Sequence, residues 1–233
     1  MNWGVYYIYF TPKFNILPPM NLLARPTGPG RPKDLEKRAA ILESAKDLFT
    51  EHGYAGVSMD AIAQAAGVSK LTVYNHFEDK QALFMAAIAA KCEAQLPHEI
   101  FEHPPEGTVR EQLLAIARAF VALISSKEAV QLHRTLISEG RADPALPGLF
   151  YAVGPKRTMD DFAQFLADRN REGQLEVPDV QRAAGHFFNL LKGEQHMRLL
   201  IGCGEPLACG ECEAHIDSVI DLFLRAYAPG RSM

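Results

Sequence analysis

Residues 58–77 (SMDAIAQAAGVSKLTVYNHF) gather hydroxyl, amide, imidazole and ammonium groups into one short segment. Apolar residues at helical spacing predict two short helices there, joined by a tight turn at Gly67. The second predicted helix, 69–77, is polar on one side, and the DNA major groove admits a helix and is read by such side chains. The sequence therefore predicts a helix-turn-helix that contacts DNA. The candidate contacts are Ser58, Ser69, Lys70, Leu71, Thr72, Tyr74, Asn75, His76 and Lys80.

Some of these side chains are suited to the DNA backbone. Lys70 and Lys80 stand at opposite ends of the predicted recognition helix, so each can pair with a phosphate and fix the position of the helix on the duplex. Tyr74 and His76 can donate hydrogen bonds to phosphate oxygens. These contacts set affinity and orientation, and they carry no sequence information.

Other side chains of the same helix can read base edges. Thr72 offers a methyl and a hydroxyl group, Asn75 offers an amide, and Leu71 can pack against a thymine methyl. The alternative is a set of three small helices that pack together and bind nothing, since this geometry occurs in many folds. The outward polar side chains favour DNA binding.

The distribution of charge agrees with a DNA-binding segment near the N-terminus. The net charge of the chain is -4, but residues 25–91 hold nine basic and eight acidic side chains. Residues 92–233 hold fourteen basic and twenty acidic side chains. The basic character is therefore confined to the front of the chain, which favours a small DNA-contacting domain on an acidic body.

Helical periodicity extends over the rest of the chain without convincing strand alternation, so the predicted fold is all-α. An N-terminal helix-turn-helix domain is predicted over 35–95, after a loosely ordered leader over 1–33. Pro97 and the prolines of 103–105 mark a linker, and a second helical domain is predicted over 106–229. Its helices are expected over 109–124, 129–139, 146–171 with a kink at Pro155, 178–201, and a last segment that includes 216–227.

The stretch from Lys37 to Ile88 is similar to the DNA-binding domain of the TetR/AcrR family of bacterial transcriptional regulators. Three segments carry the resemblance: AAILESAKDLFTEHGYAGVSMDAIAQAAGVS, SKLTVYNHF and EDKQALF. Leu71 stands where the family often has glycine, and we expect this difference to change base preference and to leave binding intact. The C-terminal segment EAHIDSVIDLFLRAYAP looks like the last helix of an AefR-like subgroup.

This resemblance implies a homodimer in which the last two helices of each copy form a four-helix interface. It implies an effector-binding and dimerisation domain over 106–229, and release from a palindromic operator in double-stranded DNA when a small molecule binds. The expected function is a repressor without a cofactor. An all-helical enzyme with an incidental helix-turn-helix is an alternative, but the sequence contains no recognisable catalytic grouping.

Polar and aromatic residues on otherwise apolar helices of the second domain are candidates for an effector pocket. The alternative for each polar group is an ordinary, hydrogen-bonded position in the core or on the surface. The candidates are Phe120, His133, Arg134, Phe162, His186, Phe187 and Asn189, with His196 as a further polar position.

A second alternative function rests on the cysteines. Cys203, Cys209, Cys212 and His215 lie within thirteen residues, and such soft ligands could hold zinc or, at Cys209 and Cys212, form a redox pair. The spacing matches no common structural zinc pattern, so an incidental cluster is the favoured interpretation. A metal- or thiol-responsive regulator stays open as the alternative.

The N-terminal run 3–10 (WGVYYIYF) is apolar, but no positive charge precedes it and no small-residue cleavage site follows, so it does not match a secretory signal. Met20 is an alternative start to the chain. No apolar run is long enough to span a bilayer. We therefore expect a cytoplasmic protein without a membrane partner and with reduced cysteines.

Overall fold

The computed structural model describes residues 31–140 and 145–230, and within these ranges the chain forms eleven helices and no strand. The predicted all-α fold is confirmed. Most of the predicted leader, 1–30, lies outside the described residues. The helices are α1 Arg31–His52, α2 Met59–Ala65, α3 Lys70–His76, α4 Lys80–Gln95, α5 Glu99–Glu102, α6 Val109–Ser125, α7 Lys127–Glu139, α8 Ala145–Val153, α9 Pro155–Arg171, α10 Val180–Ile201 and α11 Cys209–Tyr227.

Side-chain caps explain where the first helices begin. Ser58, Ser69 and Asp79 each accept a hydrogen bond from the backbone N–H three residues later, at the starts of α2, α3 and α4. Such a cap satisfies one of the N–H groups that the first turn of a helix leaves unpaired. Gly67, with φ of 65°, makes the turn between α2 and α3 in a backbone conformation that favours glycine.

Helices α1–α4, residues 31–95, form a unit that we call the head. Its core contains Ile41, Ile62, Val73 and Leu83, one from each helix and all fully buried. Phe77 joins the same core. Because α3 is only two turns long, its position depends on this packing against α1 and α2 and not on its own helical stability.

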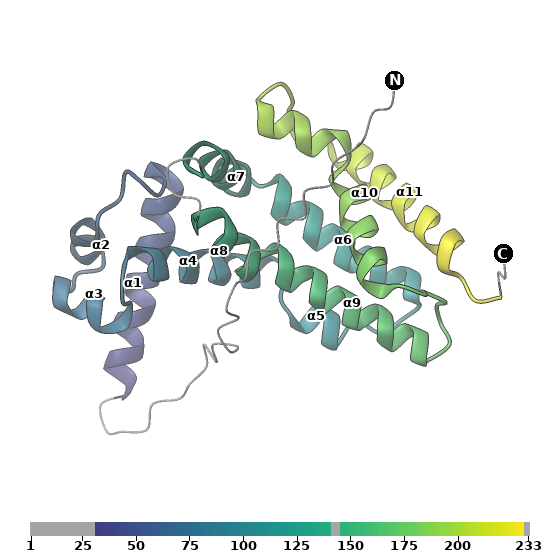
Figure 1. Ribbon diagram of the computed structural model, residues 1–233, viewed down its shortest axis with the longest axis horizontal. Helices are drawn as coiled ribbons and strands as arrows, with labels where there is room; N and C mark the ends of the chain where they lie inside the picture. The colour runs from purple at the N-terminus through teal and green to yellow at the C-terminus, as the bar shows by residue number, and fades with distance from the viewer. Residues whose placement is uncertain (1–30, 141–144, 231–233) are drawn as a thin grey trace, which may run out of the picture.

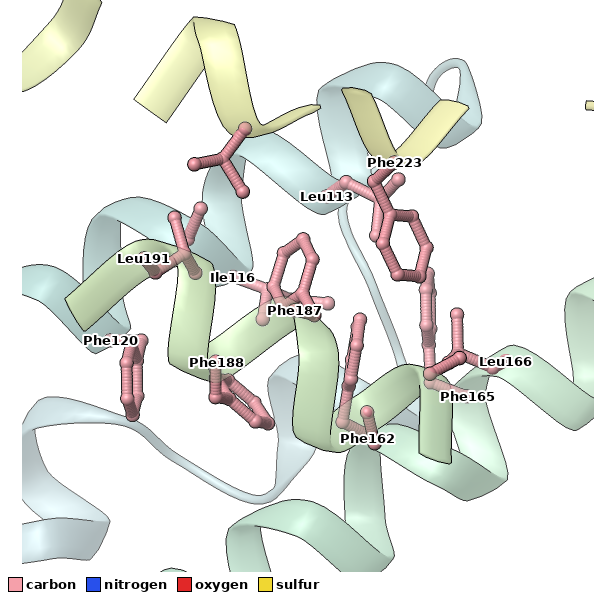
Figure 2. Packing of buried hydrophobic residues seen from close by; sticks show 14 of the residues in the cluster. Leu113, Ile116, Phe120, Phe162, Phe165, Leu166, Phe187, Phe188, Leu191 and Phe223 are labelled. Carbon is pink, nitrogen blue, oxygen red and sulfur yellow. The ribbon is translucent and has the colours of Figure 1, made fainter. Parts of the chain in front are cut away.

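Helices α5–α11, residues 99–227, form a unit that we call the body. Its core is rich in phenylalanine from α6, α9, α10 and α11 (Figure 2). The rings of Phe162 and Phe187 stack at 4.5 Å, and Phe223 meets Phe187 edge-on at 5.1 Å. Burial of each such ring contributes about 1.5–3 kcal/mol, so this cluster is a main source of the body's stability.

Helix α4 joins the two units. α2 and α3 lie at one end of the molecule, α10 and α11 at the other, and α4 runs between them beside α8 (Figure 1). Leu136 of α7 and Leu146 of α8 belong to the core of the head, although they come from the body. The expected linker contains the short helix α5, and Phe101 of α5 is buried in the body core.

The prediction of one kinked helix over 146–171 is wrong, because the segment forms two helices. α8 ends at Val153, Gly154 has non-helical backbone angles, and α9 begins at Pro155. Proline cannot supply the backbone N–H that a helix interior needs, but it suits the first turn. The helix therefore restarts at this residue.

A second interruption, inside α10, was not predicted. Gly193 has φ of 53° and ψ of -165°, so α10 consists of two helical pieces that meet at a sharp kink. The kink disturbs the hydrogen bonds of the preceding turn, and the His215 ring nitrogen Nε2 donates to the Leu191 carbonyl oxygen at 3.1 Å. His215 thus stabilises the kink from α11.

Replacement of Gly193 by alanine is expected to destabilise the protein. The backbone angles are unfavourable for alanine, and the new methyl carbon would lie 3.2 Å from the His215 ring. We expect a loss of about 1–3 kcal/mol in the free energy of unfolding, measured by urea denaturation. Gly185→Ala in the same helix is the control, because that site has open space and should gain stability. Equal stability of Gly193→Ala and the wild type would contradict the strain assigned to the kink.

Candidate nucleic-acid interface

Helix α3 presents an exposed face at the end of the head. Leu71 is 70% exposed and Tyr74 is 43% exposed, whereas Val73 between them is fully buried. Asn75 is also exposed, and Thr72 is half-buried. The side chains expected to reach base edges therefore point away from the core, as a recognition helix requires.

The hydroxyl groups of the motif are engaged at helix ends. The Ser69 oxygen accepts from the Thr72 backbone N–H at 3.1 Å and lies 2.8 Å from the Thr72 hydroxyl. The Ser58 oxygen accepts from the Ala61 N–H at 3.1 Å. Each hydroxyl that caps a helix can make one more hydrogen bond, so capping is compatible with a DNA contact.

Lys70 is held by a carboxylate of the neighbouring helix. Its Nζ donates to Asp60 Oδ2 at 2.8 Å, which raises the pKa of Lys70, and both side chains are exposed. An exposed pair of this kind is weak, so a phosphate can compete with Asp60 for the ammonium group. Asp60 therefore reduces the positive potential that α3 offers to DNA.

Lys80, at the start of α4, lies over an aromatic ring. Its Nζ is 4.3 Å from the centre of the Tyr54 ring. This cation–π contact keeps the ammonium group at the C-terminal end of α3, where a phosphate contact is predicted. Tyr54 itself stacks with Phe49 of α1, so the lysine is positioned by the core of the head.

The His76 side chain does not face outward from α3, as the sequence analysis expected. Its side chain is only 11% exposed, and Nε2 lies 3.2 Å from Asp34 Oδ1 of α1. Arg38 of the same helix packs over the Phe77 ring, next in sequence. The predicted phosphate contact from His76 is therefore replaced by a contact that holds the end of α3 against α1.

A cavity with a volume of about 390 Å³ lies where head and body meet. Phe84, Ile88 and Gln95 of α4 line one side, although α4 belongs to the predicted DNA-binding domain. Sequence reasoning missed them because it searched only the second domain. The sequence does carry a signal for them, because residues 82–90 (ALFMAAIAA) are apolar without interruption, more than a single buried helix face requires.

Some of the predicted effector residues line this cavity and others do not. Phe120, His133 and Asn189 line the cavity. Phe162 and Phe187 do not line it, because they are fully buried in the body core.

The remaining polar candidates also lie elsewhere. Arg134 is exposed and donates to the carbonyl oxygens of Leu199 and Leu200 at 2.5 and 2.9 Å. His186 is exposed and is not part of the cavity wall. Helical spacing could not separate these positions, because it does not distinguish a wall that faces a cavity from one that faces solvent or a neighbouring helix.

The cysteine-rich segment does not form a metal site in the described residues. Cys203 and Cys209 are exposed, and no group of three potential ligands lies close enough to hold an ion. His215 already donates to the Leu191 carbonyl. Burial raises the pKa of the Cys212 thiol, which lowers its reactivity. The metal-sensing alternative is not supported.

None of the described helices is long and apolar enough to cross a membrane.

Family models match both parts of the chain. Residues 41–87 match "Bacterial regulatory proteins, tetR family", and residues 111–229 match "AefR-like transcriptional repressor, C-terminal domain". The chain belongs to the TetR family of bacterial transcriptional regulators. The resemblance seen in the sequence is thus confirmed, and the TetR-family helix-turn-helix corresponds to α2 and α3.

Individual relatives agree with the TetR-family assignment. The HTH-type transcriptional repressor AcnR of Corynebacterium glutamicum is 35% identical over 82% of this chain and 92% of its own length. A TetR-family regulator from Mesorhizobium loti covers 84% of this chain and 98% of its own, with a TM-score of 0.74 and 27% identity. The flavonoid-responsive regulator FrrA covers the same shares, with a TM-score of 0.66 and 33% identity. The protein is a DNA-binding transcriptional regulator and not an enzyme.

Removal of the Asp60 carboxylate is expected to strengthen DNA binding. Asp60→Asn frees Lys70 and removes a negative charge beside the phosphates, so affinity for an operator should rise roughly two- to fivefold. Fluorescence anisotropy with labelled duplex measures the change. Glu106→Gln, which removes an exposed carboxylate of the body, should leave affinity unchanged. Weaker binding by Asp60→Asn would show that the pair supports the DNA-bound geometry.

Lys80 and Asn75 should have different roles. Lys80→Ala should weaken binding to all duplexes similarly and lower the slope of log affinity against log salt by about one. Asn75→Ala should instead change the preferred sequence, measured by selection from random duplexes. Loss of only non-specific affinity in both variants would contradict the division into phosphate-contacting and base-reading residues.

Proposed function

We propose that the protein is a homodimeric repressor that binds a palindromic operator and leaves it when a small molecule enters the cavity at α4. The observation that carries this proposal is the double role of α4. Phe84, Ala87 and Ile88 belong to the core of the head and also line the cavity. A ligand in the cavity therefore touches side chains that pack against α1, and α1 in turn contacts the recognition helix.

A ligand that binds two arrangements of the protein with different affinity is sufficient to release the protein from its operator. If the ligand binds more tightly to a pose in which α4 is displaced relative to α1, it shifts the population toward that pose. By linkage, operator DNA then binds less tightly, because it favours the other pose. α1 is the route to α3, since Phe49 of α1 lines the cavity and His76 of α3 pairs with Asp34 of α1.

The surface of α10 and α11 supports the proposal of a homodimer. Met197 and Ile201 of α10 are 59% and 68% exposed, and Leu222 of α11 is 53% exposed. Large exposed apolar side chains on the two last helices favour an interface with a second copy. The Arg110 guanidinium binds Asp217 and Asp221, and this pairing joins α11 to α6.

Repression and a small-molecule effector are supported by the relatives. AcnR and ComR are described as transcriptional repressors, and FrrA is described as flavonoid-responsive. The cavity volume of about 390 Å³ falls within the range of roughly 300–1,000 Å³ that is usual for small-molecule sites. We place the protein in the cytoplasm, where operator DNA and a diffusible effector meet.

The dimer is tested by a charge on its proposed interface. Leu222→Glu should raise the dimer dissociation constant about thirtyfold or more, as for a central interface residue, and should weaken operator binding in parallel. Analytical ultracentrifugation and anisotropy measure the two effects. Leu149→Glu is the matched control, because Leu149 is an exposed apolar residue of α8, which packs against α4, α7 and α9. Full operator affinity in a monomeric variant would overturn the proposal.

The operator itself can be found by sequencing the genomic fragments that the purified protein retains. We expect inverted repeats whose half-sites lie about one helical turn apart or slightly more. Compounds that lower anisotropy with this operator then identify the effector. Retained fragments without any shared palindrome would contradict the proposed mode of binding.

A further inference from the structure

The charges on the cavity wall all have one sign. Lys46, Lys91 and Lys192 line the cavity together with His133, and none of the described residues on its wall is an aspartate or a glutamate. The remaining wall is mainly apolar and aromatic. A cavity of this kind lacks an anion of its own.

Among the lysines of the cavity wall, Lys192 of α10 is the one whose loss of hydration is least offset by neighbouring groups. It is half-buried, and burial lowers its pKa. No carboxylate pairs with it in the described part of the chain. Desolvation of an ammonium group costs free energy unless an anion or hydrogen-bond acceptors replace the lost water. Lys46, by contrast, has an ion pair with Glu43 at 2.7 Å.

Two imidazoles beside Lys192 do not supply the missing negative charge. Burial lowers the pKa of His133, and burial with the nearby charges lowers the pKa of His196 to about 4. Both rings are therefore neutral near pH 7, and they meet edge-on at 5.6 Å. The Nδ1 atom of His133 donates to the Ala129 carbonyl, which fixes the ring beside the cavity.

Other wall groups are suited to an apolar ligand body with a polar end. The rings of Phe120 and Phe188 lie 4.5 Å apart, and both residues line the cavity. Figure 2 shows the two rings as neighbours. Gln95 places a buried side-chain oxygen on the wall without a hydrogen-bond partner among the described residues. Such an amide can rotate to donate N–H to an oxygen of a ligand. The wall thus combines an aromatic surface with unsatisfied polar groups.

We propose that the cavity binds a hydrophobic organic acid, whose single anionic group pairs with Lys192 and whose apolar part packs against Phe120 and Phe188. This inference rests on the proposed function of the cavity as the effector site. A neutral ligand of the same shape would remove more water from the ammonium group without replacing it. A cationic ligand would be repelled by every charged group on the wall.

The chemistry is tested by calorimetry on the full-length protein without DNA. The probes are three acids, phenylacetate, 2-naphthoate and decanoate, each compared with its primary amide at pH 7.5. Acid and amide have nearly the same shape, so their difference isolates the charge. We expect at least one acid to bind about tenfold or more tightly than its amide. If no acid binds more tightly than its amide, the proposal is wrong.

Variants identify the anchor. Lys192→Met keeps the length of the side chain, removes its charge, and should abolish the preference for the acid while affinity for the amide stays within about twofold. Lys156→Met is the control, because Lys156 lies on α9, pairs with Asp160 and is not part of the cavity wall. If Lys91→Met removes the preference and Lys192→Met does not, the assignment to Lys192 is wrong.

Separate measurements distinguish this inference from the proposed function. Acid binding is measured without DNA, and operator release is measured by anisotropy with the same acid. An acid preference without operator release would leave the ligand class intact and contradict the effector role. If an amide releases the operator as strongly as its acid does, the effector role is kept and the proposed ligand class is contradicted.

Discussion

The structure depends on the packing of α4 between two hydrophobic cores. Phe84 and Ile88 complete the core of the head, and their helix also contacts α6 and α8 of the body. A closely packed protein interior does not deform continuously, so a shift of α4 must be accommodated by its neighbours as a change of arrangement. The proposed effector response therefore depends on α4.

The recognition helix is positioned by its surroundings. α3 has only seven residues, and a helix of this length is not stable alone. Val73 anchors it in the head core, Ser69 caps its start, and the contact of His76 with Asp34 holds its end against α1. These contacts leave Tyr74 exposed on the outer face. The position of α3 therefore depends on α1.

Much of the fold follows from local sequence signals. The starts of α2, α3 and α4 lie at Ser58, Ser69 and Asp79, residue types that favour helix N-caps, and a capping residue acts within one turn of its own position. The effector residues were less predictable. Phe120 lines the cavity and Phe162 is in the core, although both are aromatic residues on the apolar face of a helix. Periodicity identifies the buried face, but it does not say what that face meets.

The amino-acid sequence by itself determined the all-α class, the helix-turn-helix at 58–77 and the membership of the TetR family, since these rest on local spacing and on a specific motif. Tertiary structure alone decided that His76 faces α1, that His215 supports the kink at Gly193, and that Lys192 lines a cavity without a carboxylate. Each of these contacts joins residues far apart in the chain. Their partners are set by how the helices pack in three dimensions, which helical spacing along the sequence does not encode.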